Sequence, residues 1–557
     1  MPARTAGYDF IIVGGGSSGC VAASRLVQEH DARVLLVEAG RAKGHPLLAM
    51  PAGYMKFLAH DTYLTMHRTE PQPQLDGRAP IVPQARLLGG GSAVNAMVYM
   101  RGRKADYDGW GAIIGGNAGW SYADLLTYFK AQEDNDTLAG EYHGVGGPLS
   151  VSHLGFHSEA SRAFVKAVQA LGYPFNPDFN GAAQRGVGYM QHTIDHRRQR
   201  RCSAVDAFLR PVLADPRLTV VTGARVTRIL VEAGRAIGIE YVKGVDVERA
   251  QTHGEVLLAA GTYETPKILM LSGIGPAAHL TAHGIAVRAD LPGVGENLQD
   301  HHEVPIVAAT TGAYGHFGED RGWRMVRNGL AYVLLKSGRV TTTGVEACAF
   351  VDPDERGEET IQLYCVPTVY LDRDVTGLEP THGVTLNACL LRPKARGRVR
   401  LRSSDPSDPP AVDCRFFGDE EDLRLSVEGV RFARRVLEAE PLAGMVDREI
   451  FPGPSVADDA GLAAHCRRTV KTNYHPVGTC RMGHDGDPMA VLDTQLRVRG
   501  VEGVRVIDCS LMPTIVSGNT NAPAMAIAAK AVDLIAPVEA NGASKGEAPV
   551  AGPALRR

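Results

Sequence analysis

Short apolar runs separated by glycine-rich turns dominate the first part of the chain. Residues 8–13 read Tyr-Asp-Phe-Ile-Ile-Val, and residues 33–38 form a second apolar run. Between them, small and apolar residues at 20–26 recur with the spacing of a helix that packs against a sheet. This order predicts a strand, a helix and a second strand, the repeating unit of a parallel sheet covered by helices.

The turn between the first strand and the helix carries a glycine pattern. Gly14, Gly16 and Gly19 fill G-x-G-x-x-G, and Glu38 closes the second strand. Such glycines allow a tight turn and close approach of a pyrophosphate, whose charge the helix N-terminus favours. The Glu38 carboxylate can accept hydrogen bonds from both ribose hydroxyls and repels a 2′-phosphate, which argues against NADP. The pattern therefore predicts a dinucleotide site, with a solvated strand-end carboxylate as the alternative role of Glu38.

A second glycine-rich turn follows a loop region that is rich in proline. Gly89-Gly90-Gly91-Ser92 precedes Asn95 and exposes backbone that can lie against a large planar or phosphorylated ligand. A plain turn is the alternative, and the dinucleotide motif upstream makes the cradle the favoured interpretation.

The middle of the chain alternates strand-like runs with loops, and its end returns to the opening pattern. Residues 303–470 predict an antiparallel sheet with helices on one face, because their strand-like runs are short and separated by turns. We expect strands at 218–230, 236–242, 255–260, 360–370, 383–391, 398–401 and 504–508, and helices at 120–135, 158–171, 204–213, 267–275, 419–437 and 523–535.

Dinucleotide-type signals at the start, middle and end of the chain predict a discontinuous cofactor domain. We expect it to comprise residues 1–155, 218–302 and 475–537, with a substrate domain at 156–217 and 303–474 and a disordered tail at 538–557. The expected fold class is α/β plus α+β: a Rossmann-like domain with an inserted domain built on an antiparallel sheet.

Composition excludes several classes of protein. A net charge of −3 gives no case for nucleic acid, and the basic run at 197–201 is interpreted as a solvated loop. The nine cysteines stand singly, which argues against a disulfide framework or a zinc site. Residues 1–8 lack a signal-peptide pattern, and no apolar run approaches the ~18 residues of a membrane span. We expect a cytoplasmic protein, with peripheral membrane contact and oligomeric state left open.

Two stretches near the end hold the candidate chemistry. His475 stands in Asn-Tyr-His-Pro-Val-Gly-Thr-Cys, and Asn519 stands in Ser-Gly-Asn-Thr-Asn. A neutral imidazole can take a proton near pH 7, and an amide can donate to a developing alkoxide. The adjacent His301 and His302 suggest a metal, but no further ligand stands at suitable spacing, so we expect no metal site.

These residues together resemble the glucose-methanol-choline (GMC) family of FAD oxidoreductases over nearly the whole chain. The matching patterns, in order, are Gly14 to Glu38, Gly89 to Asn95 with Arg101-Gly102, Gly261 to Gly275, and the pair of His475-Pro476 with Asn519. Within the family the chain looks most like bacterial alcohol and choline dehydrogenases.

The resemblance implies FAD as the cofactor and His475 with Asn519 as the catalytic pair. Some members attach FAD through a histidine at the position that Val94 fills here, so we expect non-covalent FAD. The positions that the family's pattern assigns to the cofactor are Gly14, Gly16, Ser17, Ser18, Gly19, Glu38, Ala39, Arg86, Gly90, Ser92, Asn95, Ala96, Met97, Val98, Val226, Ala260, Tyr474, Asp508, Asn519 and Thr520.

The expected reaction is oxidation of a primary alcohol to an aldehyde. Choline would need an aromatic cage with a carboxylate, and Trp110, Trp120 and Trp323 show no such spacing. Glu346 is the one carboxylate that we nominate to face the substrate, with a plain strand-end residue as its alternative role. A choline dehydrogenase or oxidase and a flavin-containing hydroxynitrile-type lyase are the alternatives. Oxygen and a quinone-like carrier are both open as the electron acceptor.

Overall fold

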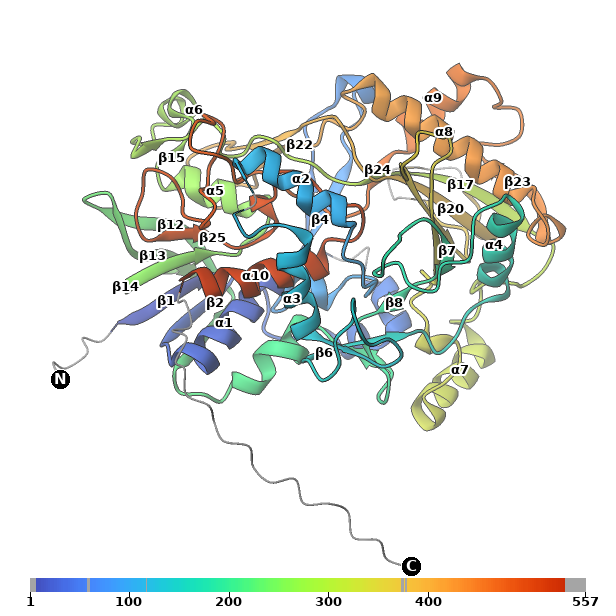
Figure 1. Cartoon of the computed structure of the whole chain (residues 1–557), viewed down its shortest axis with the longest axis horizontal. Coiled ribbons are helices and arrows are strands. Elements are labelled where there is room, and N and C mark those ends of the chain that lie inside the picture. The colour runs from blue at the N-terminus through green and yellow to red at the C-terminus, as the bar shows by residue number, and fades with distance from the viewer. Residues whose placement is uncertain (1–6, 58–60, 117, 372–374, 376–377, 536–557) are drawn as a thin grey trace, which may run out of the picture.

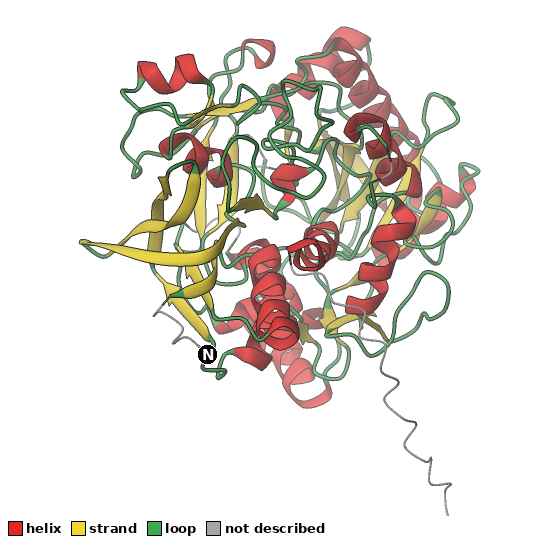
Figure 2. Cartoon of the chain, turned by 60° about the vertical axis from the view of Figure 1, so that its left-hand side comes forward, coloured by secondary structure: helices red, strands yellow, loops and turns green. Residues whose placement is uncertain are grey.

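The computed structural model describes residues 7–57, 61–116, 118–371, 375 and 378–535; the tail expected at 538–557 lies outside them. Two large sheets stand side by side, one built mainly from the start of the chain and one from its middle (Figure 1). Figure 2 shows the same division, with two separate groups of strands and helices packed beside each. The expected combination of a Rossmann-like sheet and an antiparallel sheet is confirmed.

The first sheet has a parallel part and an antiparallel part that share one long strand. Strands β11, β2, β1, β14 and β25 run parallel, whereas β12, β13 and the first half of β14 form an antiparallel meander. Ile11, Ile12, Leu35 and Leu36 are all buried, because helices and loops cover both faces of a parallel sheet. The strands are β1 (Tyr8–Val13), β2 (Val34–Glu38), β11 (Leu218–Thr222), β12 (Ala224–Glu232), β13 (Arg235–Lys243), β14 (Asp246–Leu258) and β25 (Val504–Val506).

The second sheet is antiparallel throughout and has the order β23-β17-β20-β19-β18-β7, with β24 beside β17. Its central strand β20 is buried along its whole length. The predicted run at 398–401 forms β21 (Arg398–Arg400), which pairs with β22 (Ala411–Asp413) outside this sheet. The strands of the second sheet are β7 (Gly186–Tyr189), β17 (His302–Thr310), β18 (Ala347–Val351), β19 (Ile361–Val366), β20 (Gly383–Leu390), β23 (Val446–Phe451) and β24 (Lys471–Thr472).

Helices cover the sheets unequally. On the first sheet, α10 packs against both α1 and α3; on the second, α8 lies over β17 and β20 and packs against α4 and α9 (Figure 1). The helix expected at 204–213 is one π turn followed by a 3₁₀ turn. The helices are α1 (Ser17–His30), α2 (Lys104–Ile114), α3 (Tyr122–Gln132), α4 (Glu159–Ala170), α5 (Glu264–Leu271), α6 (Ala277–Ala282), α7 (Gly322–Leu335), α8 (Glu420–Leu437), α9 (Asp459–Thr469) and α10 (Asn521–Ile535).

Short strands complete the chain between these elements. They are β3 (Leu64–Arg68) with β4 (Ile81–Ala85), β5 (Glu133–Asn135) and β8 (Gln191–His192) on either side of β6 (Leu149–His153), β9 (Ile194–Asp195) with β10 (Arg200–Arg201), and β15 (Ile274–Gly275) with β16 (Ala289–Asp290).

The first and last helices meet at their N-termini. Ser17 Oγ donates to Asn521 Oδ1 at 2.7 Å, and Ser18 Oγ donates to the Ala524 carbonyl at 3.2 Å. Farther along, the Arg25 guanidinium pairs with Asp533 at 2.9 Å. The glycine turn before α1 therefore stands next to the loop that carries Asn519.

Candidate active site

The His475 stretch runs antiparallel to the segment that ends in His301. The Asn473 N–H donates to the His301 carbonyl at 2.7 Å, and Val477 exchanges two backbone hydrogen bonds with Gln299 at 2.8 and 3.1 Å. This ladder aligns the backbone of His475 with Asp300 and His301, two residues that stand 175 and 174 positions away in sequence, respectively.

Side chains fix the backbone on both sides of His475. The His475 N–H donates to Asp300 Oδ1 at 2.8 Å, and the Thr472 hydroxyl donates to Asp300 Oδ2 at 2.5 Å. On the other side, the Thr262 hydroxyl donates to the Pro476 carbonyl at 2.7 Å. Burial raises the pKa of Asp300 to about 7. The imidazole is thus attached to a backbone that two other segments, at Asp300 and Thr262, hold in place.

The imidazole of His475 lies between His301 and Asn519. Its Nδ1 is 3.0 Å from His301 Nδ1, and its Nε2 is 3.0 Å from Asn519 Nδ2. His301 Nε2 in turn lies 2.9 Å from the Leu391 carbonyl. The two predicted catalytic residues, 44 positions apart, are therefore in contact, and His301 extends them into a chain of three polar side chains.

This chain of hydrogen bonds determines where the protons lie. A carbonyl can only accept, so His301 Nε2 carries its proton and His301 Nδ1 is an acceptor. His475 Nδ1 must then donate to it, which leaves the lone pair on His475 Nε2 facing the Asn519 amide. Burial lowers the pKa of His301 to about 4, and burial together with His301 lowers the pKa of His475 well below 6.5. Both rings are neutral at pH 7, and His475 Nε2 carries no proton and accepts from the Asn519 amide.

The two glycine turns predicted from the sequence lie against each other. The Gly89 N–H donates to the Gly15 carbonyl at 2.7 Å, and a Cβ on Gly90 would stand 2.7 Å from Gly16 Cα. Gly14 has a φ of +104°, and a Cβ there would approach the Ala259 carbonyl oxygen to 2.3 Å. Side chains at these positions would separate the turns, so glycine is required for the cradle to close.

The surroundings of this cradle fit a dinucleotide. No side chain of the described residues caps the N-terminus of α1, and its first turn carries no acid, so its amide groups suit a phosphate. Glu38, at the end of β2, accepts from the amides of Gly15 and Gly40 at 2.8 and 2.6 Å, so its carboxylate lies at the turn. Burial raises the pKa of Glu38, an effect that these amide hydrogen bonds oppose.

Asn519, in the loop next to the glycine turn, offers a further polar group to a ligand. Its Oδ1 is buried and has no hydrogen-bond partner among the described residues. Such a buried acceptor is costly unless a ligand or water satisfies it. The orphaned oxygen, the uncapped helix and the glycine cradle therefore all fit a bound FAD.

Arg201 holds the second glycine turn, a role that sequence reasoning missed. Its guanidinium donates to the carbonyls of Leu48, Ser92 and Asn95 and to Asn95 Oδ1, at 2.7–3.0 Å. Burial lowers its pKa to about 10, so it stays charged at neutral pH. The basic run was interpreted as a solvated loop; this is right for Arg197, Arg198 and Arg200, which are exposed, and wrong for the buried Arg201.

Three other residues that we expect at the cofactor form hydrogen bonds with nearby residues. Met97, in the left-handed region with φ +63°, is buried just after Asn95, and its N–H donates to Asn95 Oδ1 at 3.0 Å. Ser92 donates to the Gly89 carbonyl at 2.6 Å. Asp508 joins the strand ends by accepting from the Gly261 amide and the Thr265 hydroxyl at 2.8 and 2.6 Å.

The rest stand at strand and helix ends or in packed clusters, and their contact with the cofactor stays a prediction. Ala39 follows β2, Arg86 follows β4 against Gly40, Ala260 follows β14 beside Gly14, and Thr520 precedes α10. Ala96 and Val98 pack with Met190 and Phe350, Val226 is buried in β12, and Tyr474 has a φ of +65° and is partly exposed.

Glu346, the expected substrate contact, is occupied by the protein itself. Its Oε1 accepts from His316 Nε2 and from the Thr342 hydroxyl, both at 2.8 Å, and its Oε2 accepts from the Ser158 amide and hydroxyl at 2.7 and 2.9 Å. The side chain is fully buried. With four donors already bound, this carboxylate ties loops together, and the geometry does not favour its role in binding substrate.

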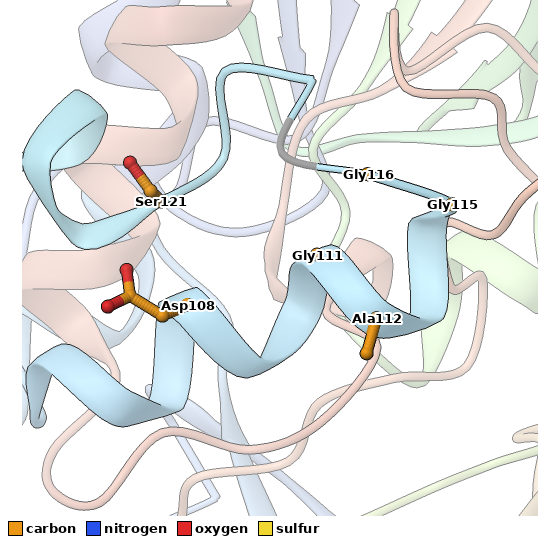
Figure 3. A pocket seen from close by; sticks show the side chains of 6 residues that line it. All are labelled: Asp108, Gly111, Ala112, Gly115, Gly116 and Ser121. Carbon is orange, nitrogen blue, oxygen red and sulfur yellow. The ribbon is translucent and has the colours of Figure 1, made fainter.

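A surface pocket lies between α2 and the start of α3, away from these residues. Figure 3 shows its lining: Asp108, Gly111, Ala112, Gly115, Gly116 and Ser121. Asp108 Oδ1 accepts from the Tyr122 amide at 3.0 Å, so this carboxylate joins the two helices. The pocket contains none of the residues expected to bind cofactor or substrate. Within the described residues, no group of three or more histidine, cysteine or acidic side chains could hold a metal ion.

Comparison with known proteins agrees with this geometry. GMC oxidoreductase family profiles match residues 8–303 and 393–528. An alcohol dehydrogenase [acceptor] from Pseudomonas putida is 40% identical over 95% of both chains, and an oxygen-dependent choline dehydrogenase from Brucella canis is 38% identical over 95% of both. An FAD-dependent oxidoreductase from Chaetomium thermophilum superimposes with a TM-score of 0.86 at 28% identity, covering 95% of this chain and 99% of the other. The chain belongs to the GMC oxidoreductases, and FAD is its cofactor.

Proposed function

We propose that this enzyme oxidises an uncharged primary alcohol to an aldehyde, with His475 as the base. The observation that carries the proposal is the proton arrangement of the Leu391–His301–His475–Asn519 chain, which presents an unprotonated His475 Nε2 beside an amide donor. The similarity to alcohol dehydrogenase supports the same reaction class.

In this mechanism His475 Nε2 takes the proton of the substrate hydroxyl. Bound FAD supplies the acceptor for the hydride that leaves the same carbon. The Asn519 amide has a second N–H and donates to the developing alkoxide, which is worth about 10²–10³ in rate for such donors. His301 Nδ1 continues to accept from His475 Nδ1–H when the ring becomes protonated, and the hydrogen bond of the His475 N–H to Asp300 keeps the backbone of the ring in place.

The residues that would hold FAD follow from the cradle. The amides at the start of α1 and the turn at 89–91 suit the pyrophosphate, and Glu38 suits the adenosine ribose. We propose that the cofactor is bound without a covalent link, because Val94 offers no nucleophile at the attachment position. Arg201 supports this binding indirectly by fixing Ser92 and Asn95.

The surroundings of Tyr474 favour an uncharged substrate over choline. A quaternary ammonium is bound by aromatic faces with a nearby carboxylate. Here Lys471 Nζ lies over the rings of Tyr370 and Tyr474, at 5.3 and 5.6 Å, and forms an ion pair with Glu303. The aromatic faces and the carboxylate next to the catalytic stretch are thus already paired with a cation of the protein. Choline remains the second candidate because of the choline dehydrogenase relative.

Anaerobic titration tests the proposal directly. The purified yellow holoenzyme is mixed with benzyl alcohol, a medium-chain alkanol or choline, and the flavin absorbance is followed. We expect an uncharged alcohol to bleach the flavin and choline to leave it oxidised. Bleaching by choline alone would overturn the substrate assignment, and a flavin that no alcohol bleaches would favour a lyase instead. Admission of oxygen after bleaching shows whether oxygen or another carrier accepts the electrons.

A further inference from the structure

α7 carries its apolar residues on the side that faces away from the protein. Asn328 and Tyr332, one turn apart, are the buried residues of this helix. At 100° per residue the opposite side presents one apolar face, whose members are 45–72% exposed: Trp323, Val326, Leu330, Val333 and Leu334. A surface helix of a globular protein normally has the reverse arrangement, with its apolar side inward. This outward face therefore marks an interaction surface.

The helix is firmly attached at its base. Glu346 joins the two chain segments that lead into and out of the helix, because it accepts from His316 on one side and Thr342 on the other. Arg339 Nη1 donates to the Gly315 carbonyl at 2.8 Å, and so also links the segment after α7 to the segment before it. α7 stands out from the body at this base (Figure 1), so its apolar face is presented in a defined direction.

Basic side chains lie along α7 and in the loop beside it. The Tyr332 hydroxyl donates to the Gln199 carbonyl at 2.8 Å, which places the exposed arginine loop beside the helix. Asp195, Glu319 and Asp320 neutralise part of this charge. The basic residues outnumber them although the whole chain has a net charge of −3, and they are Lys56, Arg197, Arg198, Arg200, Arg321, Arg324, Arg327, Lys336 and Arg339.

We propose that α7 and the adjacent arginine loop dock the enzyme on the surface of an anionic lipid bilayer. An apolar helix face with tryptophan and leucine, flanked by basic side chains, lies in the plane of a membrane interface and is attracted by anionic headgroups. With 14 residues α7 is shorter than the ~20 that a membrane span needs. Among the described residues, no helix combines the length and apolar character of a span.

A second copy of this chain is a poorer occupant of the same surface. A two-fold symmetric contact through α7 would bring each patch onto its own copy, because such an interface uses the same residues on both subunits. The arginines of the two α7 helices would then lie close together and repel one another. An anionic surface complements both the apolar face and the basic rim, and a second copy complements the apolar face alone.

Vesicle sedimentation with the holoenzyme tests the proposal. Vesicles of phosphatidylcholine alone are compared with vesicles that also contain phosphatidylglycerol, at low and high salt. We expect binding to the anionic vesicles that weakens as salt rises, since charge attraction is screened. Trp110 and Trp120 are buried while Trp323 is 72% exposed, so a blue shift of tryptophan fluorescence on binding reports insertion of α7.

Paired surface variants assign the binding to this helix. The double variant Leu330→Glu, Leu334→Glu is expected to weaken vesicle binding at least about tenfold, because it places charge on the apolar face. The matched control Val245→Glu, Val247→Glu changes two exposed valines on the β13–β14 hairpin and is expected to bind like the wild type. Absence of binding by the wild type, or equal binding by both double variants, would overturn the proposal. So would a wild-type dimer that the α7 variant converts to a monomer without any vesicle binding.

Discussion

The His475 segment and α7 differ in how completely their own chain satisfies them. Around His475, the backbone amide, both ring nitrogens and the following carbonyl all have protein partners from other segments. α7 buries Asn328 and Tyr332 and presents its apolar face to solvent. The first segment is complete within the chain, and its chemistry can be read from its contacts. α7 leaves its apolar face exposed, and the character of that face indicates the kind of partner that it fits.

Removal of the imidazole at His475 is expected to have the largest effect. His475→Ala is expected to lower kcat by about 10²–10⁴-fold, because it deletes the base that takes the hydroxyl proton. Stopped-flow reduction of the flavin by the best alcohol measures the effect, and an unchanged flavin spectrum confirms that FAD is still bound. Near-full turnover by this variant would refute the assignment of the base.

The basic run allows a test of burial between adjacent residues. Arg201→Met removes the guanidinium that fixes Ser92 and Asn95, and we expect FAD affinity to fall at least about tenfold, a cost of about 1.4 kcal/mol. Arg200→Met is the matched control, since its side chain is exposed. FAD affinity is measured by fluorescence titration of the cofactor-free protein. Equal losses in the two variants would show that FAD affinity depends on the positive charge of the loop in general and not on the hydrogen bonds of Arg201 to Ser92 and Asn95.

His301 is expected to act through His475, whose Nδ1–H it accepts. His301→Phe removes the acceptor for His475 Nδ1–H and frees the ring to adopt the other tautomer, so kcat is expected to fall about tenfold or more, as for other residues that orient an imidazole. His301→Gln keeps an acceptor and is expected to lose less. The comparison of kcat and KM for the two variants measures the role: a similar loss in both would mean that His301 contributes packing and not proton position.

Asp300 gives the smallest expected effect, on stability and its dependence on pH. Burial raises the pKa of this carboxyl to about 7 from an ordinary value of 3.8, so the stability that it contributes is full below pH ~4 and is lost as pH rises through about 7. In Asp300→Asn the amide oxygen can still accept from the His475 N–H, and its nitrogen can donate to the Thr472 hydroxyl oxygen.

Thermal unfolding of wild type and Asp300→Asn at pH 5 and pH 8 measures this difference. The variant is expected to gain stability relative to wild type on going from pH 5 to pH 8, because it lacks the buried charge. A difference between the two proteins that is the same at both pH values would contradict the raised pKa of Asp300.

The sequence predicted those features that depend on local chemistry. The turns at Gly14 and Gly90 require small residues wherever they occur, so the glycine pattern was sufficient to predict the cradle. The pairing of the opening turn with the 89–91 turn, and of His475 with Asn519, followed only from resemblance, since neither motif states which distant segment it meets. The solvated-loop interpretation of the basic run was wrong for Arg201, because this residue differs from the other arginines of the run only in burial.

The remaining failures are failures of long-range contact. His301 and His302 are adjacent and alike in sequence, yet His301 contacts His475 while His302 lies against Phe416 and Phe417. No helix was predicted at the position of α7, because the apolar residues there do not form a face that packs against the protein. Glu346 was nominated as the carboxylate that faces the substrate, and its four donors come from three segments that no local pattern connects to it.

The contact between α1 and α10 determines when the site can assemble during protein synthesis. Ser17 and Asn521 are 504 residues apart, so the ribosome must synthesise all of the residues between them before this contact can form. The glycine turn is therefore synthesised long before the Asn519 loop that lies beside it. Assembly of the cradle next to this loop has to wait until α10 has left the ribosome, whereas the turn itself is available from the start.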